Sequence, residues 1–307
     1  MAKVLVATEK PFAKVAVEGI KRIVEGTGFE FALLEKYTEK AQLLTAVADV
    51  DAIIVRSDIV SADVVEAAKN LKIVVRAGAG YDNIDLAACS AKGVVAMNTP
   101  GQNSNAVAEL ALGMMIFMAR NQFTPSAGTE IMGKRLGIHA YGNVGKLVAS
   151  HAKGFGMEIY AFDPFVKKED IEKDGVKVVN SVEELYSVSD YVSLHIPAND
   201  TTKKSVGYEL LSKMPKGGTL INTARKEVID EEGLAKALEE RSDLKYATDI
   251  AADNQAALSE KFGTRVFATP KKMGAQTSEA NINAGLAAAN QIVNYIKNGD
   301  TTFQVNK

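Results

Sequence analysis

The sequence predicts an α/β protein whose strands are parallel and whose chain forms two domains. Short apolar segments alternate with stretches of helical periodicity along the whole chain, which is typical of βαβ units. The length of 307 residues is large for one hydrophobic core. A glycine-rich strand–turn–helix segment starts only near residue 136, after a complete α/β unit. The glycine-rich segment therefore belongs to a second α/β unit.

Short apolar runs between turn residues mark the strands of the first unit. They lie at 3–7, 30–34, 52–55, 72–75 and 94–97. Helical periodicity occupies the intervals, for example at 11–26 and 61–69, and Ser61 stands where it can cap the second of these helices. This alternation predicts a parallel sheet, because parallel strands need crossover connections.

The second unit follows a break at Thr99-Pro100-Gly101. Its strands are predicted at 136–139, 157–162, 190–194, 219–222, 245–248 and 265–268. A long helix at 104–120 precedes them, and a helix rich in alanine and asparagine at 277–297 follows them. The tail at 302–305 is predicted to form a final strand.

The composition is typical of a soluble globular protein, with 47% hydrophobic and 24% charged residues. A net charge of -2 gives no basis for nucleic-acid binding, and no apolar run reaches the length of a membrane span. Cys89 is the only cysteine, which excludes a disulfide and a cysteine zinc site, and we predict no bound metal. Because the sequence shows no signal peptide, we expect a cytoplasmic protein.

The segment at 136–163 has the form strand, glycine turn, helix, strand and acid. Its turn, Tyr141-Gly142-Asn143-Val144-Gly145, matches the dinucleotide-binding fingerprint except that Ala140 replaces the first glycine. Gly142 would let the backbone approach a pyrophosphate, and Gly145 would let the helix pack closely on the strand. The N–H groups at the helix start would face the phosphates. The alternative is a tight strand–helix turn without a ligand.

An acidic residue ends the second strand of this segment. Asp163 follows Gly145 by 18 residues, which is the spacing of the carboxylate that binds the ribose hydroxyls of a dinucleotide. A 2′-phosphate at this place would meet a negative charge. The sequence therefore predicts NAD rather than NADP as the cofactor.

Several further segments resemble one family, the D-2-hydroxyacid dehydrogenases, and within it the 3-phosphoglycerate dehydrogenase branch. They are Val55-Arg56-Ser57, the runs at 74–85 and 98–110, the fingerprint, Ser193-Leu194-His195-Ile196-Pro197 and the run at 222–234. Together they span nearly the whole chain in the family's order. The resemblance implies two Rossmann-like domains, each a doubly wound parallel sheet, with a cleft between them. The substrate-binding domain would comprise residues 1–98 and 277–307, and the NAD-binding domain residues 99–276. It also implies that the serine-binding regulatory domain of longer relatives is missing.

The resemblance assigns roles to residues that follow predicted strands. Arg225 would be the catalytic arginine, whose planar fork binds the substrate carboxylate and the developing carbonyl oxygen. Asp249 would accept a hydrogen bond from the nicotinamide carboxamide. His195, Ile196, Pro197 and Thr223 would complete the cofactor site, together with Arg225. Without the resemblance, these residues could equally be ordinary loop or surface residues.

The resemblance also implies an anion site in the first unit. Backbone N–H groups at Gly78, Ala79 and Gly80 would bind the substrate carboxylate as a nest. Arg56 and Arg76 would attract a substrate phosphate. Gln102 and Asn103 would line the same cleft. The alternative for the arginines is two solvated surface side chains.

The chain departs from the family at the general base, which is a histidine paired with a glutamate. In the segment Thr269-Pro270-Lys271-Lys272-Met273-Gly274-Ala275, Lys272 occupies the histidine's place when counted back from Gly274. The glutamate's place falls near Asn254, with Asp253 beside it. A glutamate would stabilise a lysine's ammonium form, so its loss suits a lysine base. Lys271 is the neighbouring alternative, and a catalytically dead site is another.

The resemblance implies the NAD-dependent oxidation of 3-phosphoglycerate to 3-phosphohydroxypyruvate, the first step of serine biosynthesis. The alternatives are a glyoxylate or hydroxypyruvate reductase, another D-2-hydroxyacid dehydrogenase, and a non-catalytic module that senses NAD(H). The binding partner would be a small molecule, a phosphorylated 2-hydroxy acid that serves as the substrate. We also expect a homodimer, although the connection between residue 120 and the fingerprint strand is shorter than in relatives.

Overall fold

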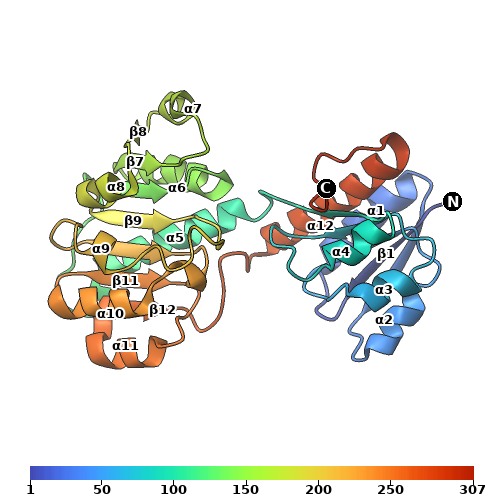
Figure 1. Cartoon of the computed structure of the whole chain (residues 1–307), viewed down its shortest axis with the longest axis horizontal. Helices are drawn as coiled ribbons and strands as arrows, with labels where there is room; N and C mark the ends of the chain where they lie inside the picture. Colours follow the sequence, from blue (N-terminus) through green and yellow to red (C-terminus); the bar gives the residue numbers. More distant parts are fainter. The chain divides into compact units, whose positions relative to one another are not determined.

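The computed structural model describes all 307 residues and divides them into two compact units (Figure 1). The first unit comprises Met1–Asn103 and Gln276–Lys307, and the second Ser104–Ala275. The boundary after Asn103 differs from the expected position after residue 98. One reason is that the Thr99 N–H donates to the Gly78 carbonyl at 2.9 Å, which holds the connecting segment to the first unit.

The first unit is built on one parallel sheet. Its strands are β1 (Lys3–Thr8), β2 (Glu30–Glu35), β3 (Ala52–Val55), β4 (Ile73–Arg76) and β5 (Val95–Asn98), in the order β2-β1-β3-β4-β5. All five predicted strands are confirmed with small shifts at their ends. Because the strand order reverses direction between β1 and β3, this point is where a doubly wound sheet of this order binds ligands.

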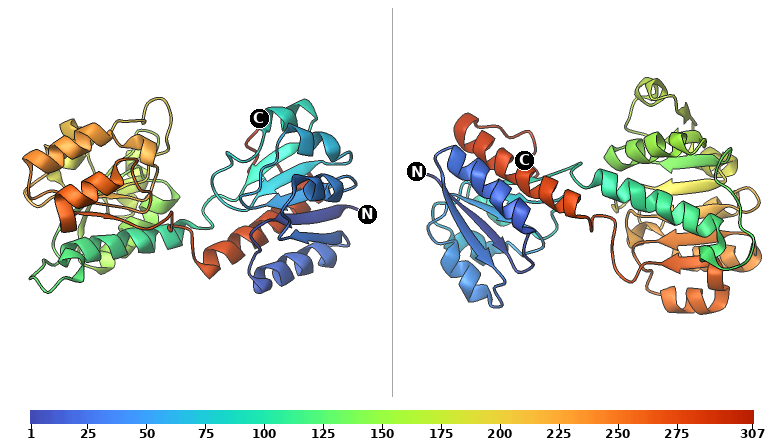
Figure 2. Two further views of the ribbon diagram at one scale, coloured as in Figure 1. Left: turned by 90° about the horizontal axis from the view of Figure 1, so that it is seen from below. Right: turned by 180° about the vertical axis from the view of Figure 1, so that it is seen from behind.

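Helices cover both faces of this sheet. The helices are α1 (Lys14–Gly26), α2 (Lys40–Ala46), α3 (Ala62–Ala67), α4 (Leu86–Ala91) and α12 (Ser278–Asn298). Helices α1 and α12 lie side by side and cover the face to which Val4 and Val6 point (Figure 2). Leu5 and Ala7 point to the other face, which α2, α3 and α4 cover. Cys89 is buried there on α4, as expected for a structural cysteine.

Two local predictions for the first unit need correction. The tail at 302–305 is not a strand, because only Gln304 forms a bridge, an isolated antiparallel one to Met97. The Asp300 carboxylate accepts hydrogen bonds from the N–H and hydroxyl of Thr302, and these bonds turn the chain. Ser61 stands at the N-cap position of α3, but its hydroxyl bonds the Asp63 carboxylate and makes no capping bond.

The second unit has a seven-stranded parallel sheet. Its strands are β6 (Arg135–His139), β7 (Glu158–Phe162), β8 (Lys177–Val178), β9 (Tyr191–Leu194), β10 (Thr219–Asn222), β11 (Lys245–Thr248) and β12 (Val266–Ala268). Their order is β12-β11-β10-β9-β6-β7-β8, the Rossmann order with one further strand. The sequence predicted all of them except β8, whose two residues form no apolar run. The strand order reverses between β6 and β9.

Helices cover both faces of this sheet as well. They are α5 (Ser104–Ala119), α6 (Asn143–Gly154), α7 (Lys168–Lys173), α8 (Val182–Val188), α9 (Tyr208–Leu211), α10 (Glu231–Glu240) and α11 (Gln255–Phe262), with short 3₁₀ turns at Asn121–Phe123, Lys226–Val228 and Gly263–Arg265. No helix in the chain combines the length and the apolar composition needed to cross a bilayer.

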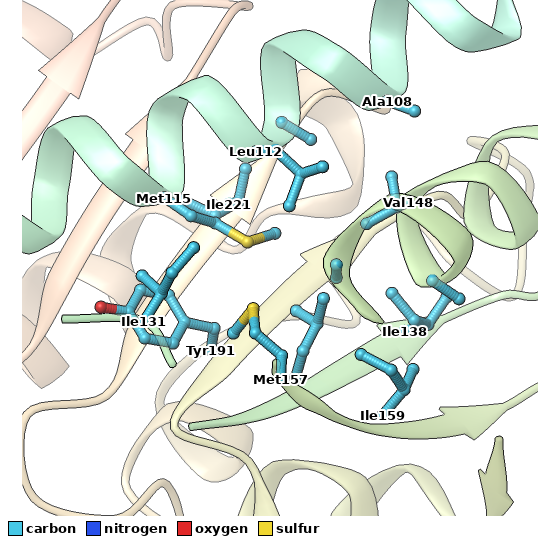
Figure 3. Close-up of a cluster of buried hydrophobic side chains, with 14 of the residues drawn as sticks. Ala108, Leu112, Met115, Ile131, Ile138, Val148, Met157, Ile159, Tyr191 and Ile221 are labelled. Carbon is cyan, nitrogen blue, oxygen red and sulfur yellow. The ribbon is translucent and has the colours of Figure 1, made fainter. Parts of the chain in front are cut away.

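The core of the second unit fixes the glycine turn in space. Leu112 and Met115 of α5 pack toward Ile138 of β6 and Val148 of α6 (Figure 3). These side chains are almost fully buried, and burying each apolar side chain contributes about 1.5–3 kcal/mol. Since β6 and α6 flank residues 140–142, their packing holds the turn between them in one position.

Candidate functional site

The glycine turn between β6 and α6 has the close approach that the fingerprint requires. A Cβ at Gly145 would lie 2.3 Å from the Ala140 carbonyl oxygen and 2.9 Å from Cγ2 of Ile138, so a larger residue would force backbone movement. A Cβ at Gly142 would meet no atom within 4 Å. Gly145 thus permits close helix–strand packing, and the backbone at Gly142 stays open to a ligand.

Ala140 adopts the backbone conformation that glycine normally supplies. Its φ is 81°, which costs a residue with a Cβ about 1–2 kcal/mol. This strain explains why the fingerprint has glycine at this place. The turn keeps this backbone conformation although alanine stands where the fingerprint has glycine.

We therefore expect Ala140→Gly to raise the free energy of unfolding of the second unit by up to about 1 kcal/mol. The melting temperature should rise by about 2–4 °C. Ala149→Gly is the matched control, because it changes a buried α-helical alanine and should destabilise by about 1 kcal/mol. Thermal unfolding followed by circular dichroism measures both. A lower melting temperature for Ala140→Gly would contradict the strain argument.

Asp163 connects the glycine turn with the segment that follows β7. Its Oδ2 accepts from the Tyr141 N–H at 2.7 Å, and its Oδ1 accepts from the Phe165 and Val166 N–H groups at 2.8 and 3.1 Å. Each carboxylate oxygen has about two acceptor positions, so Oδ2, which accepts only the Tyr141 bond, retains capacity for a ribose hydroxyl. The same contacts fix the chain that follows β7.

A pocket of about 430 Å³ opens at the carboxyl ends of β6, β7 and β9. It is lined by His139, Ala140, Gly142, Phe162, Asp163, Pro164, Phe165, Val182, His195, Ile196, Pro197, Asn199, Thr201, Thr202, Ser205 and Leu210. Five of these residues belong to the predicted cofactor set: Gly142, Asp163, His195, Ile196 and Pro197. The pocket lies at the point where the strand order reverses, which is where Rossmann sheets bind dinucleotides.

The four other residues predicted for the cofactor turn do not line this pocket. Asn143, Val144 and Gly145 form the first turn of α6. The Tyr141 side chain is buried, and its hydroxyl donates to Asp174 at 3.0 Å. Tyr141 can therefore contribute to a ligand only through its backbone.

The sequence analysis missed part of the pocket wall. Phe165 is 94% exposed directly after Asp163 and Pro164, and the polar loop at 199–205 forms the opposite part of the wall. An exposed aromatic residue next to the acid of a fingerprint is the signal that could have identified Phe165. No regular pattern marks the loop.

Two histidines line the pocket, His139 buried and His195 half-buried. Burial lowers the pKa of His139 to about 4, although the nearby Asp163 charge opposes this shift. Burial and the neighbouring His139 lower the pKa of His195 to about 3. The Nε2 atom of His195 is buried without a hydrogen-bond partner. Both rings are thus neutral at pH 7 and make the pocket less polar than its composition suggests.

A second group of residues gathers where β10, β11 and β12 end. Asp249 is fully buried after β11, and its Oδ2 accepts from the N–H groups of Gly274 at 2.7 Å and Met273 at 3.3 Å. Its Oδ1 is buried without a partner. Burial raises the pKa of the Asp249 carboxyl, while the Gly274 N–H and the charges of Lys272 and Arg225 act in the opposite direction. The carboxylate thus lies within the fields of both cations.

The loop after β10 presents Arg225. Asn222 shapes this loop, because its Oδ1 accepts from the Ala224 N–H and its Nδ2 donates to the Arg225 carbonyl. The Arg225 guanidinium is partly exposed and donates to the Ala224 carbonyl at 2.8 Å. The Thr223 hydroxyl is buried without a partner. The loop therefore offers a cation and a hydroxyl side by side.

The place expected for the family's glutamate is occupied by a helix start. Asn254 is the residue before α11, and the Glu231 carboxylate accepts from the N–H groups of Asp253 and Asn254. Asp253 forms an ion pair with Lys226 at 2.7 Å. Its carboxylate is thus engaged by another lysine.

In the first unit, the predicted anion loop follows β4. Gly78 has a φ of 150°, and a Cβ there would lie 1.4 Å from Nη1 of Arg76, so the arginine packs directly over this glycine. The Gly78 N–H donates to the Arg76 carbonyl at 2.9 Å. The Gly78 N–H is therefore engaged within the loop, unlike the expected role in an anion nest, and the prediction keeps only Ala79 and Gly80 as donors. Asn98 holds this loop by donating to the Ala79 carbonyl at 2.5 Å. Gln102 and Asn103 follow Asn98 in the same unit.

Arg56 is not a freely solvated side chain. Its Nη1 donates to the carbonyls of Lys10 and Pro11 at 3.2 and 3.0 Å, and its Nη2 to Oδ1 of Asn281. Burial lowers its pKa. Its own carbonyl accepts from Nε of Arg76 at 3.0 Å. The two arginines are thus linked and lie at neighbouring strand ends.

The fold agrees with comparisons against known proteins. Residues 106–271 match the family model described as D-isomer specific 2-hydroxyacid dehydrogenase, NAD binding domain. The chain belongs to the D-2-hydroxyacid dehydrogenase family. A 3-phosphoglycerate dehydrogenase of Entamoeba histolytica, solved with bound NAD+, is 49% identical to it, with a TM-score of 0.87 over 100% of this chain and 99% of that one.

Curated members of the family match it at lower identity. The D-3-phosphoglycerate dehydrogenase of Methanocaldococcus jannaschii is 38% identical over 82% of this chain and 51% of its own length. The hydroxypyruvate reductase of Thermotoga maritima is 36% identical over 86% of this chain and 90% of its own. The chain thus spans about half the length of the curated phosphoglycerate dehydrogenase, but most of the reductase.

Proposed function

We propose that this dehydrogenase oxidises 3-phosphoglycerate to 3-phosphohydroxypyruvate with NAD. The observation that carries the proposal is the group formed by Arg225, Asp249 and Lys272 at the carboxyl ends of the strands of a Rossmann sheet. In such a group Arg225 offers a cation for the substrate carboxylate, and Lys272 offers an amine that can accept the proton of the substrate hydroxyl. The proposed reaction is the first step of serine biosynthesis.

The residues present fit NAD. The open backbone at Gly142 and the start of α6 suit the pyrophosphate, and Asp163 suits the ribose hydroxyls. The unpaired, buried Oδ1 of Asp249 suits a carboxamide N–H group. Bound by these residues, the nicotinamide would supply the acceptor for the hydride that leaves C2 of the substrate.

The chain's own residues would handle the proton and the charge. We assign Lys272 as the general base that removes the proton from the C2 hydroxyl, for which its amine must be neutral. We assign Arg225 to the substrate carboxylate and to the oxygen that becomes a carbonyl. Asp249 holds the 273–274 backbone through two hydrogen bonds and so fixes the segment that carries Lys272.

The first unit would bind the anionic groups of the substrate. The backbone N–H groups of Ala79 and Gly80 suit a carboxylate, and Arg56 and Arg76 suit a phosphate. The packing of Arg76 over Gly78 keeps the arginine next to this loop. Two adjacent cations favour a phosphorylated substrate over a small neutral one, as 3-phosphoglycerate requires.

The direct test is the rate of NADH formation from NAD with 3-phosphoglycerate, D-glycerate or D-lactate as substrate. We expect 3-phosphoglycerate to give the largest kcat/KM. A larger value for either unphosphorylated acid would refute the proposed substrate but leave the dehydrogenase assignment in place.

A second candidate is reduction of hydroxypyruvate or glyoxylate. It is favoured by the similarity to the Thermotoga maritima hydroxypyruvate reductase, of which the chain covers 90%. The same enzyme assayed with NADH would separate the two candidates. A reductase of this type should show no preference for the phosphorylated keto acid.

Cofactor choice gives a further prediction. We expect NAD to bind at least about tenfold more tightly than NADP, because a 2′-phosphate would face the Asp163 carboxylate. Asp163→Ser should reduce the difference between the affinities for NAD and NADP, and the fold should be retained. Fluorescence titration with NADH and NADPH measures both affinities. Equal affinities in the wild-type protein would contradict the role of Asp163.

We also propose a homodimer in the cytoplasm. The segment between α5 and β6 exposes Phe123 and Met132, by 67% and 70%, and such apolar side chains suit a contact between two copies. Light scattering of the purified protein would measure its mass in solution.

A further inference from the structure

The sheet of the first unit has a ligand-binding position that the roles proposed for Arg56 and Arg76 do not fully use. The strand order reverses between β1 and β3, so the loops after these two strands diverge and leave a crevice at their carboxyl ends. The loop after β1 carries Glu9 and Lys10, and the loop after β3 carries Arg56. These two loops are the natural place for an anionic ligand group in this unit.

The loop after β1 is held firmly at this position. The Lys10 carbonyl accepts from the Thr8 hydroxyl at 2.6 Å and from Nη1 of Arg56 at 3.2 Å. The same Nη1 bonds the Pro11 carbonyl, and the guanidinium lies 5.1 Å from the centre of the Phe12 ring. Arg56 therefore ties the backbone of Lys10 directly to the site proposed for the phosphate.

A buried carboxylate anchors the same loop from the other side. Asp58 is only 6% exposed, and its Oδ1 accepts from the Glu9 N–H at 2.6 Å and from the Tyr37 hydroxyl at 2.8 Å. Its Oδ2 accepts from the Arg56 N–H at 3.3 Å. Asp58 thus joins the ends of β1, β2 and β3. Hydrogen bonds from the Arg56 guanidinium and to the buried Asp58 carboxylate set the position of the Lys10 backbone relative to Arg56, and the Lys10 side chain is exposed.

We propose that Lys10 is a third cation for the substrate's phosphate, beside Arg56 and Arg76, and that it sets the preference for phosphorylated substrates. This proposal rests on the proposed function. The Lys10 stem is long and flexible, so its ammonium can reach a dianion held by the Arg56 guanidinium next to its own backbone. The exposed Glu9 carries the opposite charge on the same loop and should weaken the attraction.

The test compares variants in the reductive direction with NADH, using 3-phosphohydroxypyruvate and hydroxypyruvate as substrates. We expect Lys10→Gln to raise the KM for the phosphorylated substrate about three- to tenfold, as for one partly solvated ion pair. The KM for hydroxypyruvate and both kcat values should stay unchanged. Lys10→Arg should retain the wild-type KM, and Glu9→Gln should lower the KM for the phosphorylated substrate.

Lys14→Gln is the matched control. Lys14 begins α1 only four positions along the chain, and its side chain is 90% exposed, so its loss should alter neither KM. An unchanged KM for the phosphorylated substrate in Lys10→Gln would overturn the proposal. An equal rise for both substrates would also overturn it, because the effect would not depend on the phosphate. Equal KM values for both substrates in the wild-type enzyme would refute the proposed function before any variant is made.

Discussion

Lys272→Ala should lower kcat for 3-phosphoglycerate oxidation by about 10²–10⁴-fold, the usual contribution of a general base. NAD binding should persist, because the pocket at β6, β7 and β9 does not include this residue. Steady-state kinetics and a fluorescence titration with NADH measure the two effects separately. A loss of both would indicate misfolding rather than loss of the base.

The dependence of the oxidation rate on pH is an independent test of Lys272 as the general base. A lysine base must lose its proton before it can accept one, and its ordinary pKa is about 10.4, compared with about 6.5 for histidine. Oxidation by the wild-type enzyme should therefore rise with pH into the alkaline range. A profile that levels off near pH 7 would point to a different base.

Neighbouring variants test the register of this segment. Lys271→Ala should have a milder effect than Lys272→Ala, because Lys271 would act only through its charge. Lys272→His should recover little activity, since Asp253 is paired with Lys226 and Asn254 is the N-cap residue of α11, which leaves no carboxylate there to orient an imidazole. If Lys271→Ala is inactive while Lys272→Ala turns over normally, the register is off by one residue.

Acidification should destabilise the second unit, with His139 as a main cause. Burial lowers the pKa of His139 from 6.5 to about 4, so the unfolded chain binds a proton at higher pH than the folded one. The contribution of neutral His139 to the free energy of unfolding is therefore present above about pH 6.5 and is lost as the pH falls toward 4. At pH 5 the loss from this residue is about 2 kcal/mol. His195, whose pKa is lowered to about 3, acts in the same direction.

His139→Phe removes this proton-binding site and keeps an aromatic ring against Phe162 and Tyr186. We expect the fall in unfolding free energy between pH 7.5 and pH 5 to be smaller than in the wild type by about 2 kcal/mol. Urea unfolding at both pH values provides the measurement. An identical pH dependence in His139→Phe would contradict the burial argument.

The sequence alone determined the succession of strands and helices in this protein. Buried parallel strands are nearly continuous apolar runs, and their neighbours in the chain have helical periodicity, so both are visible locally. The strand β8 and the tail at 302–305 show the limit of this approach. Two residues are too few to form a pattern, and pairing in a short tail depends on the partner strand and on the turn made by Asp300.

The motifs likewise located the glycine turn between β6 and α6, because its spacing along one strand–turn–helix unit is local. Gly145 and Asp163 take the positions that this spacing requires. The positive φ of Ala140 could not be predicted from the residue type, since alanine disfavours it. The packing of β6 against α6 imposes that conformation.

Only the tertiary structure decided which distant residues act together. Lys10, Arg56 and Asn281 are far apart in the sequence, and parallel strand order and α12 bring them into contact. The same holds for Asp249, whose unpaired oxygen and nearby cations depend on three separate loops. Local patterns encode elements, because they depend on neighbours along the chain. Hydrogen-bond partners and the burial of charges depend on neighbours in space, which only the folded chain defines.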